Sequence, residues 1–277
     1  TIAFPVNMRE MDKINYLAGQ CKLGVLVDSI EILNYLTKQI QHPVKVWVEV
    51  DAGYPRSGIP WHEVEQIQAL IDEIEQSPLL RLGGLLSHFG QTYLAKSKLE
   101  IISIHREAVK RLNKLKNTLR VNAPLNISIG DTPSCSVVER FEGVDEIRPG
   151  NFVFYDLMQL ELGSCVEGDI SAMVACPVVS IQRQRSEIVL YGGGVHLSKE
   201  VLTDVKGQNH YGKLVEVRED GWGHLRKNCS VTSLSQEHGI VHLSDEFIEE
   251  VKVGDAVLVA PVHSCLVADL ISHYYVF

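Results

Sequence analysis

VKVWVEV, residues 44–50, is the clearest strand in the chain and decides the fold. Successive side chains of a strand point to opposite faces, so the four valines share one face and Lys45, Trp47 and Glu49 share the other. Helical patterns lie on both sides of this stretch in the sequence. It therefore predicts one βα unit of a parallel sheet.

Similar units precede and follow this strand. Further strands are expected at residues 2–6, 24–27, 81–87, 125–129 and 146–148. Helices are expected at residues 8–19, 31–40 (with Ser29 as N-cap), from Pro60 onward, 98–119 and 134–140. About six βα units in succession predict a parallel sheet, in which the loops that follow the strands carry the chemistry. From about Leu160, short alternating runs at residues 186–191, 213–217, 240–243 and 256–259 predict a smaller all-β domain.

Composition limits the classes of function. The 277 residues are 45% hydrophobic and 22% charged, which is typical of a globular protein with room for two domains. The net charge of −9 argues against broad binding to nucleic acid or to an anionic membrane surface. No apolar run reaches the ~18 residues of a membrane helix, and no secretory leader is evident. The six cysteines are scattered without a CxxC motif, which favours a reduced, cytoplasmic setting.

His263 and Cys265 are the candidate metal ligands. They fall in a stretch, residues 256–271, that the pattern predicts to be β-rich, so their side chains are expected on one face of a strand. An imidazole and a thiolate on the same face can share a soft divalent ion, most plausibly zinc, with coordination positions left open for chemistry. A buried thiol beside an ordinary histidine is the alternative, and spacing alone favours it.

Four loops after predicted strands hold unusual polar residues. Gly130–Ser134 could bind a phosphate through free amides and the Thr132 hydroxyl, or could be a plain turn. Gly150, in the loop at residues 148–151, would let a ligand approach the backbone closely. The loop at residues 51–58 combines a carboxylate, a tyrosine and an arginine, and His88 ends another strand. A surface turn and a structural histidine are the respective alternatives for these last two.

In order, several segments of the chain match one family. They are DAGYPRSG (51–58), GGLLSHFG (83–90), SIGDTPS (128–134), EIRPGNFVFYDLMQ (146–159), YGGGVHLS (191–198), LSQEHGIVHL (234–243) and VGDAVLVAPVHSC (253–265). With these segments the chain resembles the D-serine dehydratase and D-threonine aldolase family, pyridoxal phosphate enzymes of the alanine-racemase-like fold. The segments RPGNFVFYD and HSC are the most specific of the set.

The resemblance implies an architecture. Residues 1–160 would form an incomplete (β/α)8 barrel that binds pyridoxal 5′-phosphate, and residues 161–277 a smaller all-β domain that carries the metal ligands. A homodimer is implied as well, with a small D-amino acid as substrate and no nucleic-acid or membrane partner. The family forms its Schiff base with a lysine on the first barrel strand, whereas this chain starts at what resembles the third. The chain is therefore expected to be a fragment or a natural truncation without that lysine.

The resemblance also implies roles for individual residues. The residues implied to bind the cofactor are Arg56, His88, Gly130, Asp131, Thr132, Arg148, Gly150, Asn151 and Tyr155. Among these, Arg148 would face the ring nitrogen, His88 would lie beside the ring, and Arg56 would contact the cofactor or the substrate carboxylate. His263 and Cys265 match the zinc pair of the dehydratase branch; the aldolase branch has a carboxylate in place of the cysteine.

The activity that the resemblance implies for the full-length enzyme is that of a metal-assisted lyase on β-hydroxy D-amino acids. Dehydration would release a keto acid and ammonia, while aldolase chemistry would release glycine, and the same two ligands suit both. Two alternatives stay open. One is an amino-acid racemase, and the other is a protein that binds pyridoxal phosphate without catalysis because the lysine is missing.

Overall fold

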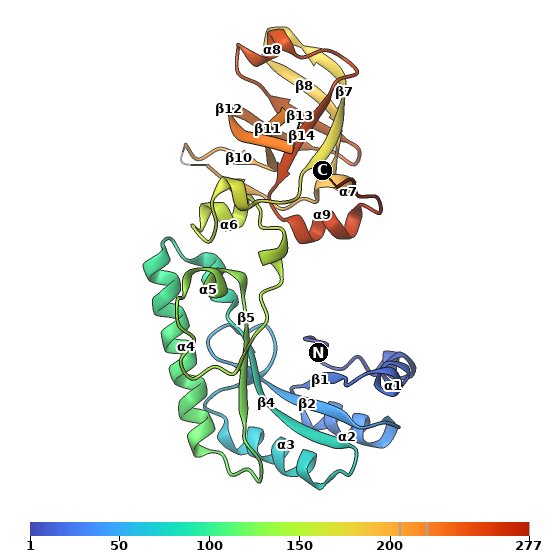
Figure 1. The fold of residues 1–277 in the computed structure, drawn as a ribbon, viewed down its shortest axis with the longest axis vertical. Helices are drawn as coiled ribbons and strands as arrows, with labels where there is room; N and C mark the ends of the chain where they lie inside the picture. The colour runs from blue at the N-terminus through green and yellow to red at the C-terminus, as the bar shows by residue number, and fades with distance from the viewer. Residues whose placement is uncertain (205, 220, 277) are drawn as a thin grey trace. The chain divides into compact units, whose positions relative to one another are not determined.

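A parallel sheet organises the first of the two units into which the chain divides, Thr1–Gly150 and Asn151–Phe277. The computed structural model describes residues 1–204, 206–219 and 221–276. The strands of the sheet are β1 (Gly24–Val27), β2 (Val44–Asp51), β3 (Ile59–Pro60), β4 (Leu80–His88), β5 (Asn126–Gly130) and β6 (Glu146–Ile147). They are parallel and lie in the order β1-β2-β4-β5-β6, with the short β3 beside β2 (Figure 1).

The helices of this unit are α1 (Met11–Gln20), α2 (Ile30–Gln39), α3 (Val64–Gln76), α4 (Lys98–Thr118) and α5 (Thr132–Val137), with 3-10 turns at Met8–Glu10 and Gly90–Leu94. The first four of them cover one face of the sheet. The four valines of β2 pack with apolar residues of α1 to α4 in a single core. Alternation places Trp47 on the opposite face, where it packs with Leu26 and Leu86 in a separate small cluster. The valine face predicted from the sequence is therefore the helix-covered face.

Two predictions about the ends of elements in this unit are wrong. The expected strand at residues 2–6 is only an isolated bridge between Pro5 and Leu26, and Phe4 is 69% exposed. A proline lacks the N–H that a ladder needs, and no strand of the described sheet lies beyond this edge. The helix expected from Pro60 begins instead at Val64, because Ile59–Pro60 pairs with the end of β2.

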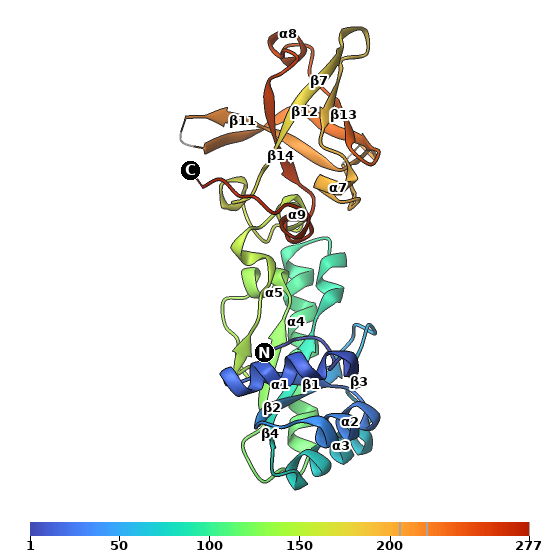
Figure 2. The ribbon, with the colours of Figure 1, turned by 90° about the vertical axis from the view of Figure 1, so that its right-hand side faces the viewer.

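The second unit contains a closed antiparallel barrel. Its strands, in the order β11-β12-β13-β8-β7-β14, are β7 (Val174–Gln182), β8 (Glu187–Tyr191), β11 (Gly212–Arg218), β12 (Gly221–Leu234), β13 (His238–His242) and β14 (Ala256–Pro261) (Figure 2). The remaining elements are β9 (Leu202–Thr203), β10 (Asn209–His210), α6 (Leu157–Glu161), α7 (Gly194–Leu197), α8 (Phe247–Glu250) and α9 (Ser264–Leu270), with 3-10 turns at Asn151–Val153, Glu167–Asp169 and Arg183–Arg185. The predicted order of an α/β part followed by an all-β part is confirmed.

The β-rich run expected at residues 256–271 is wrong in its second half. Strand β14 ends at Pro261, and a helix, α9, starts at Ser264. His263 is the N-cap residue of this helix and Cys265 lies in its first turn. Strand alternation therefore does not explain how the two candidate ligands are placed. Short apolar runs fit a strand and a helix equally well, which accounts for the error.

Candidate functional site

His88 lies at the carboxyl end of β4, at the edge of the sheet where chemistry was expected. Its Nδ1 donates a hydrogen bond to the carbonyl oxygen of Gly130 on the adjacent strand β5. Burial, helped by the positive charge of Arg56, lowers the pKa of the imidazole to about 4. At neutral pH the ring is therefore uncharged, with its proton on Nδ1 and an acceptor lone pair on Nε2.

Two tyrosines flank His88, of which Tyr54 lies in the loop already noted from the sequence and Tyr93 was not predicted. The ring centroids of Tyr54 and Tyr93 lie 5.8 Å and 6.3 Å from the imidazole centroid. A methyl group on Gly90 would collide with the ring of Tyr54, so glycine is needed there for the close approach. The motif DAGYPRSG contained Tyr54, and its loop position after a strand was the available indication.

Arg148 is held in place by polar groups of strands β4, β5 and β6. Its Nε donates to the Ser128 hydroxyl at 2.7 Å and its Nη2 to the Ser87 carbonyl at 3.2 Å. Glu146 lies 3.7 Å from Nε and also accepts a hydrogen bond from the same serine, at 2.5 Å. The guanidinium is thus oriented by neighbours on three strands or strand ends before any ligand is considered.

Glu49 is a buried carboxylate on the face of the sheet opposite the helices, and it was not among the predicted site residues. One oxygen accepts a hydrogen bond from Ser57 at 2.8 Å, while the other is buried without a hydrogen-bond partner in the described part of the chain. Burial raises the pKa of this carboxyl group. Its bond to Ser57 ties the loop that carries Arg56 to strand β2.

The polar groups of the Gly130–Ser134 turn make more hydrogen bonds within the protein than the sequence predicted. The Asp131 carboxylate accepts hydrogen bonds from the Ser134 amide and the Thr92 hydroxyl, both at 2.8 Å, and caps α5. The amide of Thr132 points to the Tyr93 hydroxyl at 3.4 Å. The expected row of free amides is therefore largely engaged within the protein. A methyl group added to Gly150 would meet nothing within 4 Å, so that position is open.

The second unit holds the His263 and Cys265 pair in a turn fixed by Asp156. The Asp156 carboxylate is fully buried and accepts hydrogen bonds from the Ser264 amide at 3.0 Å and the Gln159 amide at 2.9 Å. The Ser264 hydroxyl donates to the carbonyl of Tyr155 at 2.5 Å. The residue between the two candidate ligands is thus bound through both its amide and its hydroxyl.

The backbone of Tyr155 is strained to make this contact. Its φ of 48° lies in the left-handed region, which costs about 1 kcal/mol or more for a residue with a side chain. The next residue, Asp156, also accepts a hydrogen bond from the Asn151 side-chain amide at 2.5 Å. Such strain at a site is typical of a position with a functional constraint.

Cys265 has an amide oxygen as its neighbour. Its Sγ lies 3.5 Å from Oδ1 of Asn151. Burial, and next the charge of Asp156, raise the pKa of this thiol. Across residues 1–204, 206–219 and 221–276, no group of three or more His, Cys, Asp or Glu side chains is placed to hold a metal ion. A metal on His263 and Cys265 would therefore complete its coordination with other ligands, such as water or substrate.

No helix among the described residues is long and apolar enough to cross a bilayer.

Two family models match the chain. The "Alanine racemase, N-terminal domain" model matches residues 6–157, and the "Putative serine dehydratase domain" model matches residues 171–277. D-serine dehydratase of Dictyostelium discoideum is 29% identical over 92% of this chain and 68% of its own length. The chain spans 64% to 68% of the length of the curated relatives it matches.

Solved structures show the same fold. D-threo-3-hydroxyaspartate dehydratase from Delftia sp. HT23 has a TM-score of 0.85 at 21% identity, over 98% of this chain and 74% of that one. A cysteine-to-alanine mutant of that enzyme is described as a metal-free form. D-threonine aldolase from Filomicrobium marinum has a TM-score of 0.76 at 21% identity, over 96% of this chain and 68% of that one.

Proposed function

Because this chain belongs to the alanine racemase N-terminal domain family, we propose that it is the core of a pyridoxal-phosphate-dependent, metal-assisted lyase acting on β-hydroxy D-amino acids. Three observations support the reaction class. A relative matching 92% of the chain is a D-serine dehydratase, a dehydratase and an aldolase share its fold, and the second family model is a serine dehydratase domain. We favour dehydration over aldol cleavage because Cys265 is a soft donor that suits zinc, whereas the aldolase branch has a carboxylate in place of this cysteine.

The residues at the end of the parallel sheet fit an anionic cofactor. Arg56 and Arg148 both lower the pKa of His88 through their positive charge, so the potential here favours a phosphate. We propose that these three residues, with the backbone of Gly130 to Thr132 and of Gly150, hold pyridoxal 5′-phosphate. When bound, the cofactor supplies an electron sink for charge that develops at Cα.

Each of these residues contributes a defined property. Neutral His88 offers Nε2 as a hydrogen-bond acceptor and does not compete with the arginines for an anion. Arg148 stays where Ser128 and Ser87 hold it, so it presents a fixed cation. The Asp131 side chain holds the Gly130–Thr132 turn in place through Ser134 and Thr92, so the turn keeps one conformation toward a ligand.

The single observation that carries the metal proposal is the fixed His263–Ser264–Cys265 turn. A nitrogen and a sulfur donor separated by one residue, with that residue bound to Asp156, fit zinc. When bound, zinc supplies Lewis-acid stabilisation of a departing hydroxide. We place Asn151 and Tyr155 in support of this pair, because Asn151 contacts Cys265 and Tyr155 binds Ser264.

Product analysis tests the reaction. The protein, in a form that includes the Schiff-base lysine of the family, is supplied with pyridoxal 5′-phosphate and zinc and incubated with D-serine and with D-threonine. We expect pyruvate and 2-oxobutyrate, each with ammonia. Formation of glycine and acetaldehyde from D-threonine would show that the reaction is aldol cleavage and not dehydration. L-serine formed from D-serine would overturn the lyase proposal in favour of a racemase.

Zinc content tests the metal pair independently of activity. We expect about one zinc per chain in the wild-type protein and at least about a tenfold loss of zinc affinity in His263→Ala and Cys265→Ala. Cys21→Ala is the matched control, because Cys21 is an exposed free cysteine in the other unit. Equal zinc in all four proteins, measured by elemental analysis after dialysis, would remove His263 and Cys265 as the ligands.

A further inference from the structure

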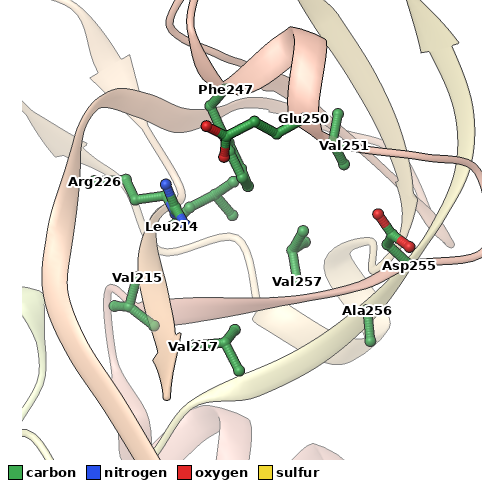
Figure 3. Close-up of a pocket in the computed structure, with 10 residues that line it drawn as sticks. All are labelled: Leu214, Val215, Val217, Arg226, Phe247, Glu250, Val251, Asp255, Ala256 and Val257. Atoms are coloured by element: carbon green, nitrogen blue, oxygen red, sulfur yellow. The ribbon is translucent and has the colours of Figure 1, made fainter.

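A pocket of about 360 Å³ opens in the second unit where two barrel strands separate (Figure 3). Strands β11 and β14 are paired only at residues 212–214 with 259–261. Beyond this short seam the strands diverge, and Val215 and Val217 of β11 face the opening together with Val257 of β14. This volume is in the range of small-molecule sites, which is about 300–1,000 Å³.

Arg226 gives the pocket a cation that the protein does not neutralise. Its guanidinium carbon lies 3.9 Å from the centroid of the Phe247 ring. Its Nε is buried and makes no hydrogen bond within the described residues, and no ion pair of Arg226 occurs there either. A buried N–H without a partner is costly, so an acceptor from outside the chain is expected to fill it.

Two carboxylates line the same pocket. In Figure 3 the carboxylate of Glu250 lies on the side of Arg226, and Asp255 lies across the pocket. In the described part of the chain neither carboxylate forms an ion pair, and Asp255 accepts a hydrogen bond from the Lys252 amide at 2.8 Å. One cation and one anion side by side, but not paired with each other, match the two charges of an α-amino acid.

We propose that this pocket binds a free α-amino acid with a neutral, apolar side chain. The ligand carboxylate meets Arg226 and its ammonium group meets Glu250, while its side chain lies against Val217 and Val257. A simple anion would face two carboxylates and only one cation, so a zwitterion suits the site better. Asp255 repels ligands that have an acidic side chain.

This proposal does not depend on the proposed lyase activity. His263, Cys265 and the residues at the end of the parallel sheet are not among the residues that line the pocket. Binding can therefore be measured in protein without pyridoxal phosphate or zinc. Retention of binding in His263→Ala excludes the metal pair as its location.

Titration calorimetry and NMR with four probes test the ligand class. Valine is expected to bind saturably below about 20 mM, which is within the range of weak amino-acid sites. Isovalerate lacks the ammonium group and isobutylamine lacks the carboxylate, so each is expected to bind at least about tenfold more weakly. Glutamate is expected to bind more weakly than valine because of Asp255. No saturable binding of valine, or isovalerate binding as tightly as valine, would overturn the proposal.

Two variants and a control locate the site. Arg226→Gln and Glu250→Gln are each expected to weaken valine binding at least about tenfold. Arg185→Gln is the matched control and should bind as the wild type does, because Arg185 is an exposed arginine of the same unit paired with Glu187 at 2.7 Å. Folding of each variant is checked by its melting temperature. Wild-type affinity in a folded Arg226→Gln variant would overturn the proposal.

Discussion

The polar end of the parallel sheet and the His263–Cys265 turn are built in different ways. At the sheet end, strand order brings together side chains from several strands and from the loops that follow them, and His88 lies directly across a ladder from Gly130. At the turn, one carboxylate binds an amide 108 residues away, from Asp156 to Ser264. The first arrangement follows from the order of strands, whereas the second depends on a few contacts between residues far apart in the sequence, of which the bond from Ser264 to Asp156 is one.

The largest effect is expected at Gly84, because the sheet has no room for a side chain at this position. Its φ is +141°, and an added methyl group would collide with the backbone of Asn126 on β5. We expect Gly84→Ala to lower the free energy of unfolding by at least about 3 kcal/mol, measured in urea. The matched control is Gly150→Ala, where nothing lies within 4 Å, and a change within about 0.5 kcal/mol is expected. Similar values for both variants would contradict this account of the sheet.

Removal of the Asp156 carboxylate tests how much of the turn's stability comes from this one side chain. Asp156→Ala leaves the buried amides of Ser264 and Gln159 and the side chain of Asn151 without their acceptor. We expect a loss of about 3 kcal/mol in the free energy of unfolding, measured by denaturant titration. Asp169→Asn is the control, because Asp169 caps an exposed turn, and it should cost about 1 kcal/mol or less. A loss below that of the control would show that the turn is held by other contacts.

A smaller effect is expected from His88 at the sheet end, as a dependence of stability on pH. The pKa of His88 is about 4 in the folded protein and about 6.5 in the unfolded chain, so the unfolded chain binds more protons between these values. The stability that neutral His88 contributes is complete above pH 6.5 and is lost as the pH falls toward 4. Because the ring is partly exposed, solvent screening reduces the effect, and we expect the free energy of unfolding to fall by about 2 kcal/mol over this pH range.

The measurement compares unfolding free energies of the wild type and His88→Gln from pH 7 to pH 4.5. The difference between them should shrink on acidification, since only the wild type carries the imidazole. NMR of the ring nitrogens should show Nδ1 protonated and Nε2 unprotonated at pH 6. A doubly protonated ring at pH 6 would contradict the assignment.

The sequence predicted features that depend on local patterns. The alternation in β2 separated its valine face from its mixed face as the structure has them, and the Ser29 hydroxyl accepts a hydrogen bond from the Ile32 amide as an N-cap should. His88 was expected at a strand end and lies there. These features need only neighbouring residues, so one sequence suffices to find them.

Features that depend on distant partners were missed or misjudged. Asp156 received no role because its partner Ser264 lies beyond the whole barrel in the sequence. The strand expected through Cys265 was wrong because Val262 and Leu266 fit either an extended or a helical pattern. Glu49 was placed on the correct face, but its burial depends on the other strands of the sheet.

The bond between Asp156 and Ser264 has a consequence for how the second unit could be re-engineered. The main chain leaves this point before β7 and returns to it after β14, and Met158 also bonds to the carbonyl of Val262 at 3.3 Å. The segments that enter and leave the six-stranded barrel therefore lie next to each other and are joined by hydrogen bonds. Modules whose termini adjoin are those that tolerate transplantation and circular permutation. A different barrel could be grafted here without disturbing the junction itself.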